Sequence, residues 1–180
     1  AIRAYDETLA VRPDLPDVHN DKGNTLSLMG QHIEALAAYD RAVALRPSYA
    51  RAFYNRGVTL ARLGQLEEAV EAFERCLRLR LDIPEAHYGK GVALARLENL
   101  SEAVVAFDRA LALRPSFPDA MLQKARAHSR LGQEREALDW LSQAIDASEP
   151  VRTQARNERD FDALRTSPSH GREFEELIAG

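Results

Sequence analysis

Apolar side chains recur at helical spacing along most of the chain. Residues 53–63 carry one such stripe, formed by Phe53, Val58, Leu60 and Leu63. Residues 66–79 carry a second, formed by Leu66, Ala69, Val70, Phe73, Cys76, Leu77 and Leu79. Between the stripes, Gly64 can adopt the left-handed conformation that commonly ends a helix. The pattern therefore predicts two antiparallel helices of about 12–14 residues each.

The same helix pair returns with a period of 34 residues. The phrase AYDRAVALRPSYARA begins at Ala38, and a near copy, AFDRALALRPSFPDA, begins at Ala106. Helices this short are marginal alone in water, so we expect each pair to be stabilised by stacking on its neighbours. The period predicts a partial repeat, four complete repeats and a C-terminal segment that leaves the period: residues 1–15, 16–49, 50–83, 84–117, 118–151 and 152–180.

Individual positions within the repeat have predictable roles in packing. Small residues recur in the first helix at Gly23, Gly57, Gly91 and Ala125, and bulky residues recur in the second helix at Tyr5, Tyr39, Phe73, Phe107 and Leu141. We expect the small positions to let paired helices approach and the bulky ones to fill the space between them. Cys76 occupies a small, buried position. Glu98 replaces the turn glycine, and Asn99 beside it is a candidate substitute.

These residues resemble the tetratricopeptide repeat family. The resemblance rests on the order bulky, small, LG, Ala, aromatic, Ala and Pro, as in YNRGVTLARLGQLEEAVEAFERCL and YGKGVALARLENLSEAVVAFDRALALRP. It implies an all-α fold, a right-handed α-α superhelical solenoid of antiparallel helix pairs. It also implies that the first helices line a concave groove that binds partner proteins.

The two ends depart from the complete repeat. Residues 1–15 match a second helix without its partner, which favours a fragment of a longer array; an exposed helix of this kind would also favour homo-oligomers. Near the C-terminus, Pro168 suits the first turn of a last helix whose apolar stripe contains Phe174, Leu177 and Ile178. We expect this helix to cap the last repeat; the alternative is a mobile helix that occupies the groove.

Composition argues against several classes of function. The formal net charge is −4 and there is no basic run, which disfavours nucleic acid as a partner. No apolar run approaches the length of a membrane span. The histidines show no metal-ligand spacing, and the GKG at residues 89–91 lacks the strand of a phosphate loop. We therefore expect no cofactor, no metal and no enzymatic activity; the compartment stays open, with the cytoplasm favoured.

The candidate site is the surface of the first helices. Arg62, Arg96 and Arg130 recur at one position, either as favourable charges near helix C-termini or as contacts for a partner's carboxylates. Tyrosines beside aliphatic residues suit an extended peptide or a partner helix. The candidate groove residues are Asn20, Asn24, Arg51, Tyr54, Asn55, Val58, Arg62, Glu85, Tyr88, Val92, Arg96, Leu122, Arg126 and Arg130.

Two binding mechanisms implied by the family are incomplete in this chain. Asn24 and Asn55 match the asparagines of the carboxylate clamp of chaperone adaptors, but its cationic positions hold Asn20, Glu85 and Gly89. The asparagine ladder of O-linked N-acetylglucosamine transferases is also interrupted, at Asp21, Gly89 and Gln123. The sequence thus predicts a scaffold that binds a protein or peptide partner. The alternatives are an accessory array of a larger enzyme and a self-association module.

Overall fold

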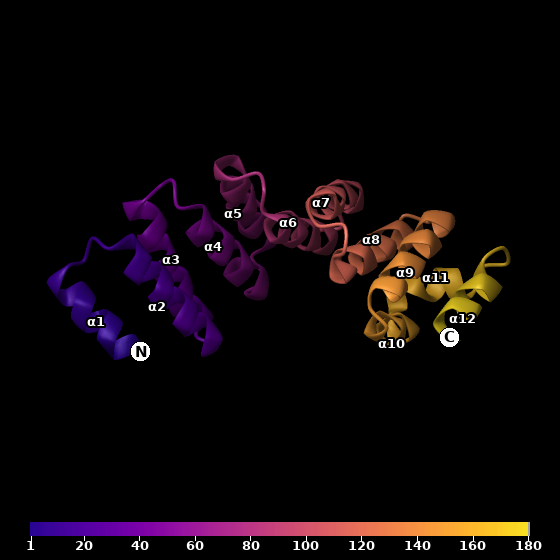
Figure 1. Ribbon diagram of the computed structural model, residues 1–180, viewed down its shortest axis with the longest axis horizontal. Helices are drawn as coiled ribbons and strands as arrows, with labels where there is room; N and C mark the ends of the chain where they lie inside the picture. Colours follow the sequence, from indigo (N-terminus) through magenta and orange to yellow (C-terminus); the bar gives the residue numbers. More distant parts are fainter. Residues whose placement is uncertain (180) are drawn as a thin grey trace. The chain divides into compact units, whose positions relative to one another are not determined.

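The computed structural model describes residues 1–179, and Figure 1 shows that they form helices joined by short turns. These residues contain twelve α-helices and one short 3₁₀ helix, with no strand among them. The chain divides into two compact units, Ala1–Ala93 and Leu94–Gly180, and the boundary falls within one helix, α6 (Pro84–Arg96). Each unit is described by itself.

Unit 1 contains the first five helices and most of α6. Their bounds are α1 Ile2–Val11, α2 Pro16–Leu28, α3 His32–Leu45, α4 Ala50–Arg62 and α5 Leu66–Leu79. The first helices α2 and α4 have 13 residues and the second helices α3 and α5 have 14, as the apolar stripes predict. Within the unit, α2 packs on α3, α3 on α4, and α4 on α5.

Unit 2 continues the pattern and then leaves it. After the end of α6 it contains α7 Leu100–Leu113, α8 Pro118–Arg130, α9 Glu134–Ala147, α10 Pro150–Asn157, η1 Arg159–Phe161, α11 Asp162–Arg165 and α12 Gly171–Ala179. Helix α7 packs on α8, and α8 packs on α9. The C-terminal elements pack back on this core, because η1 and α11 contact α8 while α10 contacts both α9 and α12.

The core of unit 1 is built from aromatic rings set against glycines. A Cβ atom on Gly23 would lie 2.6 Å from the Tyr39 ring, and one on Gly57 would lie 2.9 Å from the Phe73 ring. Gly89 makes the same kind of contact with Phe73, at 2.6 Å. Tyr39 and Phe73 are 2% and 1% exposed. The predicted pairing of small and bulky positions is therefore confirmed for these rings.

The turn between α6 and α7 corrects one prediction. Gly30, Gly64 and Gly132 end their helices with a positive φ, as expected of turn glycines. At the equivalent place Glu98 itself takes the left-handed conformation, with a φ of 63°. Asn99 has a φ of −81° and stands at the N-cap position of α7 without a side-chain capping hydrogen bond, so it does not substitute for the glycine. The turn thus has the same backbone conformation as the glycine turns, although it carries the Glu98 side chain.

A ladder of ion pairs, which the apolar pattern gave no reason to expect, joins each first helix to the second helix before it. The cation always lies 16 residues after its acidic partner. The pairs are Lys22 with Asp6 at 2.6 Å, Arg56 with Asp40 at 2.6 Å, Lys90 with Glu74 at 2.7 Å, and Lys124 with Asp108. Each pair crosses the joint between two neighbouring repeats, so the ladder links every first helix to the repeat before it.

The C-terminal segment packs on α8 and α9. Phe161 and Phe174 are fully buried with ring centroids 5.8 Å apart, and Ile178 is 3% exposed. Pro168 lies in the turn that opens the last helix, as expected. The Ser167 Oγ accepts hydrogen bonds from the backbone N–H groups of Ser169 and His170, and the Gly171 N–H donates to the Ser167 carbonyl oxygen at 2.9 Å. Regular helix follows from Gly171, where a Cβ would lie 2.8 Å from the carbonyl oxygen of Arg165, so this close approach requires a glycine.

The single cysteine is buried in the core of unit 1, and we expect it to be unreactive in the folded protein. Cys76 is 0% exposed, and burial raises the pKa of its thiol to about 11. Because the thiolate is the reacting form, both effects slow alkylation. Iodoacetamide at pH 8, followed by intact mass, is expected to modify the protein in 6 M guanidinium chloride and to leave the native protein largely unmodified. Comparable rates in the two conditions would contradict the buried assignment.

Candidate binding pocket

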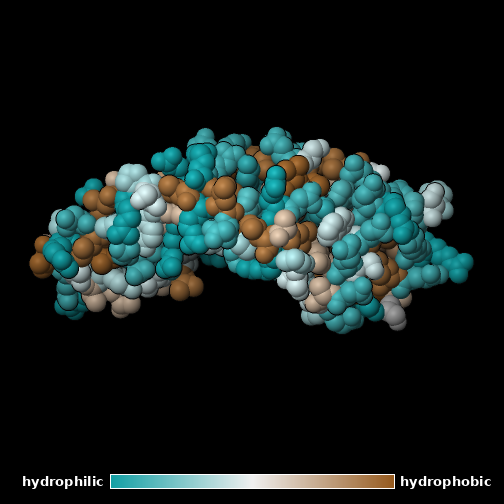
Figure 2. Space-filling model, turned by 45° about the horizontal axis from the view of Figure 1, so that its top comes forward, coloured by the Kyte–Doolittle hydropathy of each residue, from teal (hydrophilic) through white to brown (hydrophobic). Residues whose placement is uncertain are grey.

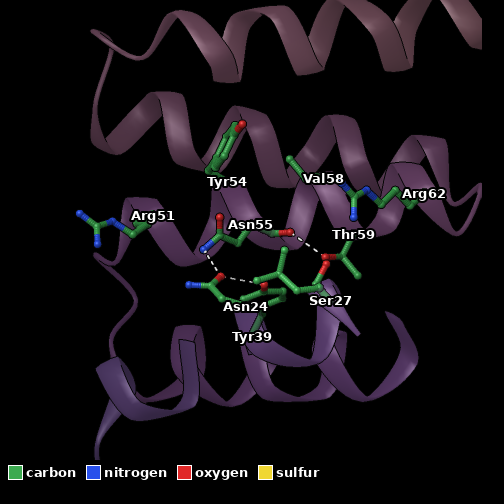
Figure 3. A pocket seen from close by; sticks show the side chains of 10 residues that line it. Asn24, Ser27, Tyr39, Arg51, Tyr54, Asn55, Val58, Thr59 and Arg62 are labelled. Atoms are coloured by element: carbon green, nitrogen blue, oxygen red, sulfur yellow. Dashed lines mark hydrogen bonds between the residues drawn. The ribbon is translucent and has the colours of Figure 1, made fainter. Parts of the chain in front are cut away.

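A pocket of about 350 Å³ opens on unit 1 between α2 and α4. It is lined by Asn24, Ser27, Leu28, Tyr39, Arg51, Tyr54, Asn55, Val58, Thr59 and Arg62. In Figure 3, Arg51 and Arg62 lie at opposite ends of α4, with Tyr54, Asn55 and Val58 between them. A second pocket of about 390 Å³ adjoins it, because both share Arg51, Tyr54 and Asn55.

An amide cluster forms the floor of this pocket. The Asn55 Nδ2 donates to Asn20 Oδ1 at 3.0 Å and to Asn24 Oδ1 at 2.9 Å. The Tyr39 hydroxyl donates to the same Asn24 oxygen at 2.9 Å. Because these bonds fix both amides, Asn24 turns its Nδ2 donor, and Asn55 its Oδ1 acceptor, away from the cluster. A donor and an acceptor side by side complement the C=O and N–H groups of a peptide chain.

The tyrosine beneath the amides is held in its neutral form. Burial raises the pKa of Tyr39 to about 12, so its hydroxyl remains a donor over the physiological pH range. Its ring also rests against Gly23, which places the hydroxyl beneath Asn24. The same residue therefore fills the core and orients the pocket. The repeat pattern predicted only the first of these roles.

The upper part of the pocket combines apolar side chains with cations. Tyr54 is half-buried and packs on Phe73, with ring centroids 6.0 Å apart. Val58 is also half-buried, while Leu28 at the pocket edge is 89% exposed. Arg51 and Arg62 are both exposed. The ten lining residues thus include two arginines and no acidic side chain.

Some of the predicted groove residues of unit 1 line the pocket, and the others do not. Asn24, Arg51, Tyr54, Asn55, Val58 and Arg62 come together around the pocket. Asn20 is 0% exposed and serves as an internal partner of Asn55, so its predicted place on the binding surface is wrong. Glu85, Tyr88 and Val92 are half-buried on α6 and do not line either pocket. Gly89 lacks a side chain because the Phe73 ring occupies that space.

The predicted residues of unit 2 are mostly engaged within the unit. Leu122 is 5% exposed, so it belongs to the core and its predicted place in the groove is wrong. Arg126 pairs with Asp160 at 2.7 Å and with Glu158 at 3.4 Å. Arg130 donates to the carbonyl oxygen of Ala95 at 3.2 Å and pairs with Glu98. Its positive charge therefore lies at the C-terminus of α6, a neighbouring helix, and Arg96 remains exposed.

Two histidines have a role that the sequence did not indicate. Each ring reaches back to the loop that precedes its helix. The Nε2 of His19 lies 2.9 Å from the carbonyl oxygen of Pro13, and that of His87 lies 3.2 Å from the carbonyl oxygen of Leu81. Both contacts span six residues. They tie the entry loop of a repeat to its first helix.

Residues 1–179 contain no group of three or more His, Cys, Asp or Glu side chains placed to hold a metal ion. Over the same residues, none of the helices combines the length and the apolar character that crossing a bilayer requires. The face drawn in Figure 2 is mainly hydrophilic, with separate hydrophobic patches.

The helix pairs and their packing define an all-α solenoid protein of repeated antiparallel hairpins. Sequence families described as tetratricopeptide repeat match residues 14–82, 60–116 and 94–155. The chain belongs to the tetratricopeptide repeat family. A comparison with curated protein sequences gives no match.

Solved structures show the same fold. YrrB, described as a tetratricopeptide repeat protein with an unusual peptide-binding site, matches with a TM-score of 0.81 and 23% identity over 99% of this chain and 92% of its own. MamA matches with a TM-score of 0.80 and 23% identity over 83% and 87%. The first repeat domain of Spaghetti (RPAP3), solved with the HSP90 peptide SRMEEVD, has a TM-score of 0.64 and 24% identity over 65% and 93%.

Proposed function

We propose that this chain is a non-catalytic scaffold that binds a peptide segment of a partner protein in the pocket between α2 and α4. The observation that carries the proposal is the pairing of the Asn24 and Asn55 amides beneath an open, partly apolar pocket. An amide donor and acceptor match a peptide backbone, while Tyr54 and Val58 offer apolar contact to side chains.

Known proteins of this fold support the same conclusion. YrrB is described by its peptide-binding site, and the Spaghetti repeat domain was solved with a bound peptide. Identities of 23% and 24% transfer the fold and not the ligand. The pocket of this chain must therefore be judged by its own residues. Because Asn20 is buried and Glu85 is acidic, the partner is expected to differ from one held by a complete carboxylate clamp.

Replacing Tyr54 with alanine is expected to weaken partner binding about 30-fold. The side chain lines both adjoining pockets, and a central aromatic anchor typically contributes about 2 kcal/mol to an interface. A tagged chain would first capture partners from an extract of the source cells, and the binding segment would then be mapped by truncation. Calorimetry with that segment measures the loss.

The matched control is Phe53→Ala, at the preceding residue of the same helix. Phe53 is half-buried, as Tyr54 is, but lines neither pocket. Its removal is expected to change affinity less than threefold when both variants keep the helical circular dichroism of the parent. If Tyr54→Ala bound as tightly as the parent chain, the pocket would not be the binding site.

A further inference from the structure

The two arginines of the pocket differ from their counterparts in the other repeats. The positions equivalent to Arg51 hold Asp17, Glu85 and Asp119, so a cation stands there in the second repeat alone. Asp17 forms a bidentate ion pair with Arg46, at 2.9 and 2.7 Å, and that pair holds the pKa of Asp17 below its usual range. Arg51, by contrast, is exposed and forms no ion pair within residues 1–179.

Arg62 lacks the acidic partner that its counterpart in unit 2 has. Arg130 pairs with Glu98, which lies 32 residues before it, at the turn that follows α6. The residue in the same relation to Arg62 is Gly30, which has no side chain. Arg62 therefore stands at one end of the pocket without an ion pair in the described chain, whereas the charges of Arg126 and Arg130 are balanced inside unit 2.

The distance between Arg51 and Arg62 determines how far apart two acidic groups of a bound chain must lie. They lie near the two ends of the 13-residue helix α4, with the amides and the apolar side chains between them. A rise of about 1.5 Å per residue over eleven residues places their Cα atoms about 16 Å apart. An extended chain advances about 3.3 Å per residue, so this distance corresponds to about five residues of ligand.

We propose that the pocket takes an extended segment of a partner protein in which two carboxylates lie about five residues apart and flank uncharged, partly apolar residues. The inference rests on the proposed function and adds the chemistry of the partner. One carboxylate pairs with Arg51 and the other with Arg62. The backbone between them meets Asn24 and Asn55, and its side chains contact Tyr54 and Val58. A nucleic acid is a poorer match, because only two cations line the pocket.

Synthetic peptides test this spacing directly. The probe is a fluorescein-labelled twelve-residue peptide of Ala, Leu and Ser with two glutamates five residues apart, compared with versions that carry two glutamines or glutamates two residues apart. Fluorescence anisotropy in 50 mM salt measures each affinity. Two exposed ion pairs together give about a tenfold preference for the five-residue spacing, and 500 mM salt reduces it by screening.

Protein variants locate the contacts. Arg51→Glu and Arg62→Glu are each expected to remove most of the preference for the glutamate peptide. Arg41→Glu makes the same charge change at an exposed position of α3 that does not line the pocket, and it is expected to keep the preference. Equal binding of glutamate and glutamine peptides, or no binding of any of them, would overturn the inference. Suppose that the glutamate and glutamine peptides bind the parent chain equally. If Tyr54→Ala then binds neither peptide, the proposed function still stands and only the inference fails. If Tyr54→Ala still binds them, the inference and the proposed function both fail. Displacement of the peptide by oligothymidylate at lower concentration would also overturn the inference.

Discussion

Replacing Phe73 with alanine is expected to lower the free energy of unfolding of unit 1 by about 3–5 kcal/mol. The ring is 1% exposed and is the common contact of Gly57, Gly89 and Tyr54. Neither glycine has a side chain that could move into the vacated space, so the cavity would stay largely open. Urea unfolding followed by circular dichroism, together with hydrogen exchange of α4 and α5, measures the loss.

The control for this substitution is Phe53→Ala, which removes the same side chain from a half-buried position of α4. We expect it to cost less than half as much, because part of the Phe53 ring already meets water. Hydrogen exchange is needed because repeat proteins open unit by unit, so a single transition is not assured. Equal losses in the two variants would show that Phe73 does not fill the space between the repeats.

Replacing Phe174 with alanine is expected to release the C-terminal cap. The ring is fully buried, lies 5.8 Å from the Phe161 ring and is covered by the Arg165 guanidinium at 5.3 Å. Removal of such a ring lowers the free energy of unfolding by about 3–5 kcal/mol. A short segment cannot lose that much stability and remain ordered. Limited proteolysis with trypsin is expected to cut at Arg165 and Arg172 faster in the variant, while cleavage within unit 1 is unchanged.

Leu177→Ala is the matched control for the cap, because Leu177 is half-buried on the same helix. It is expected to raise the rate of cleavage only slightly. Equal protection of Phe174→Ala and the parent would contradict a packed cap. It would instead favour the alternative of a mobile last helix that occupies the groove.

The repeat itself was predictable because it rests on local residue size. Every helix pair needs a small residue facing a bulky one, so Gly57 and Phe73 could be assigned to the core from their period alone. The Glu98 turn was not predictable in the same way. At this turn the geometry of the repeated helix hairpin requires a left-handed backbone. Glu98 adopts that conformation, although glycine or asparagine adopts it more easily.

The candidate site was predictable only in part, because burial within a helix surface depends on neighbouring helices. Asn20 and Asn24 lie one turn apart, yet Asn20 is covered by Asn55 and Asn24 lines the pocket. Arg126 looked like a groove residue because no periodic signal shows that Glu158 and Asp160 fold back onto α8. The ladder from Lys22 to Lys124 could have been found, since its 16-residue spacing repeats in the sequence.

The proposed role of the chain depends on the binding of a partner segment in the pocket between α2 and α4. The most direct test is a titration of the ¹⁵N-labelled chain with the segment mapped from the captured partner, observed through the side-chain amide signals of Asn24 and Asn55. We predict saturable shifts of the Asn24 signal and of the backbone amides from Arg51 to Arg62, and Tyr54→Ala is expected to need about 30-fold more of the segment to give the same shifts. Shifts confined to residues outside α2 and α4, with the Asn24 signal unmoved at saturation, would contradict the claim.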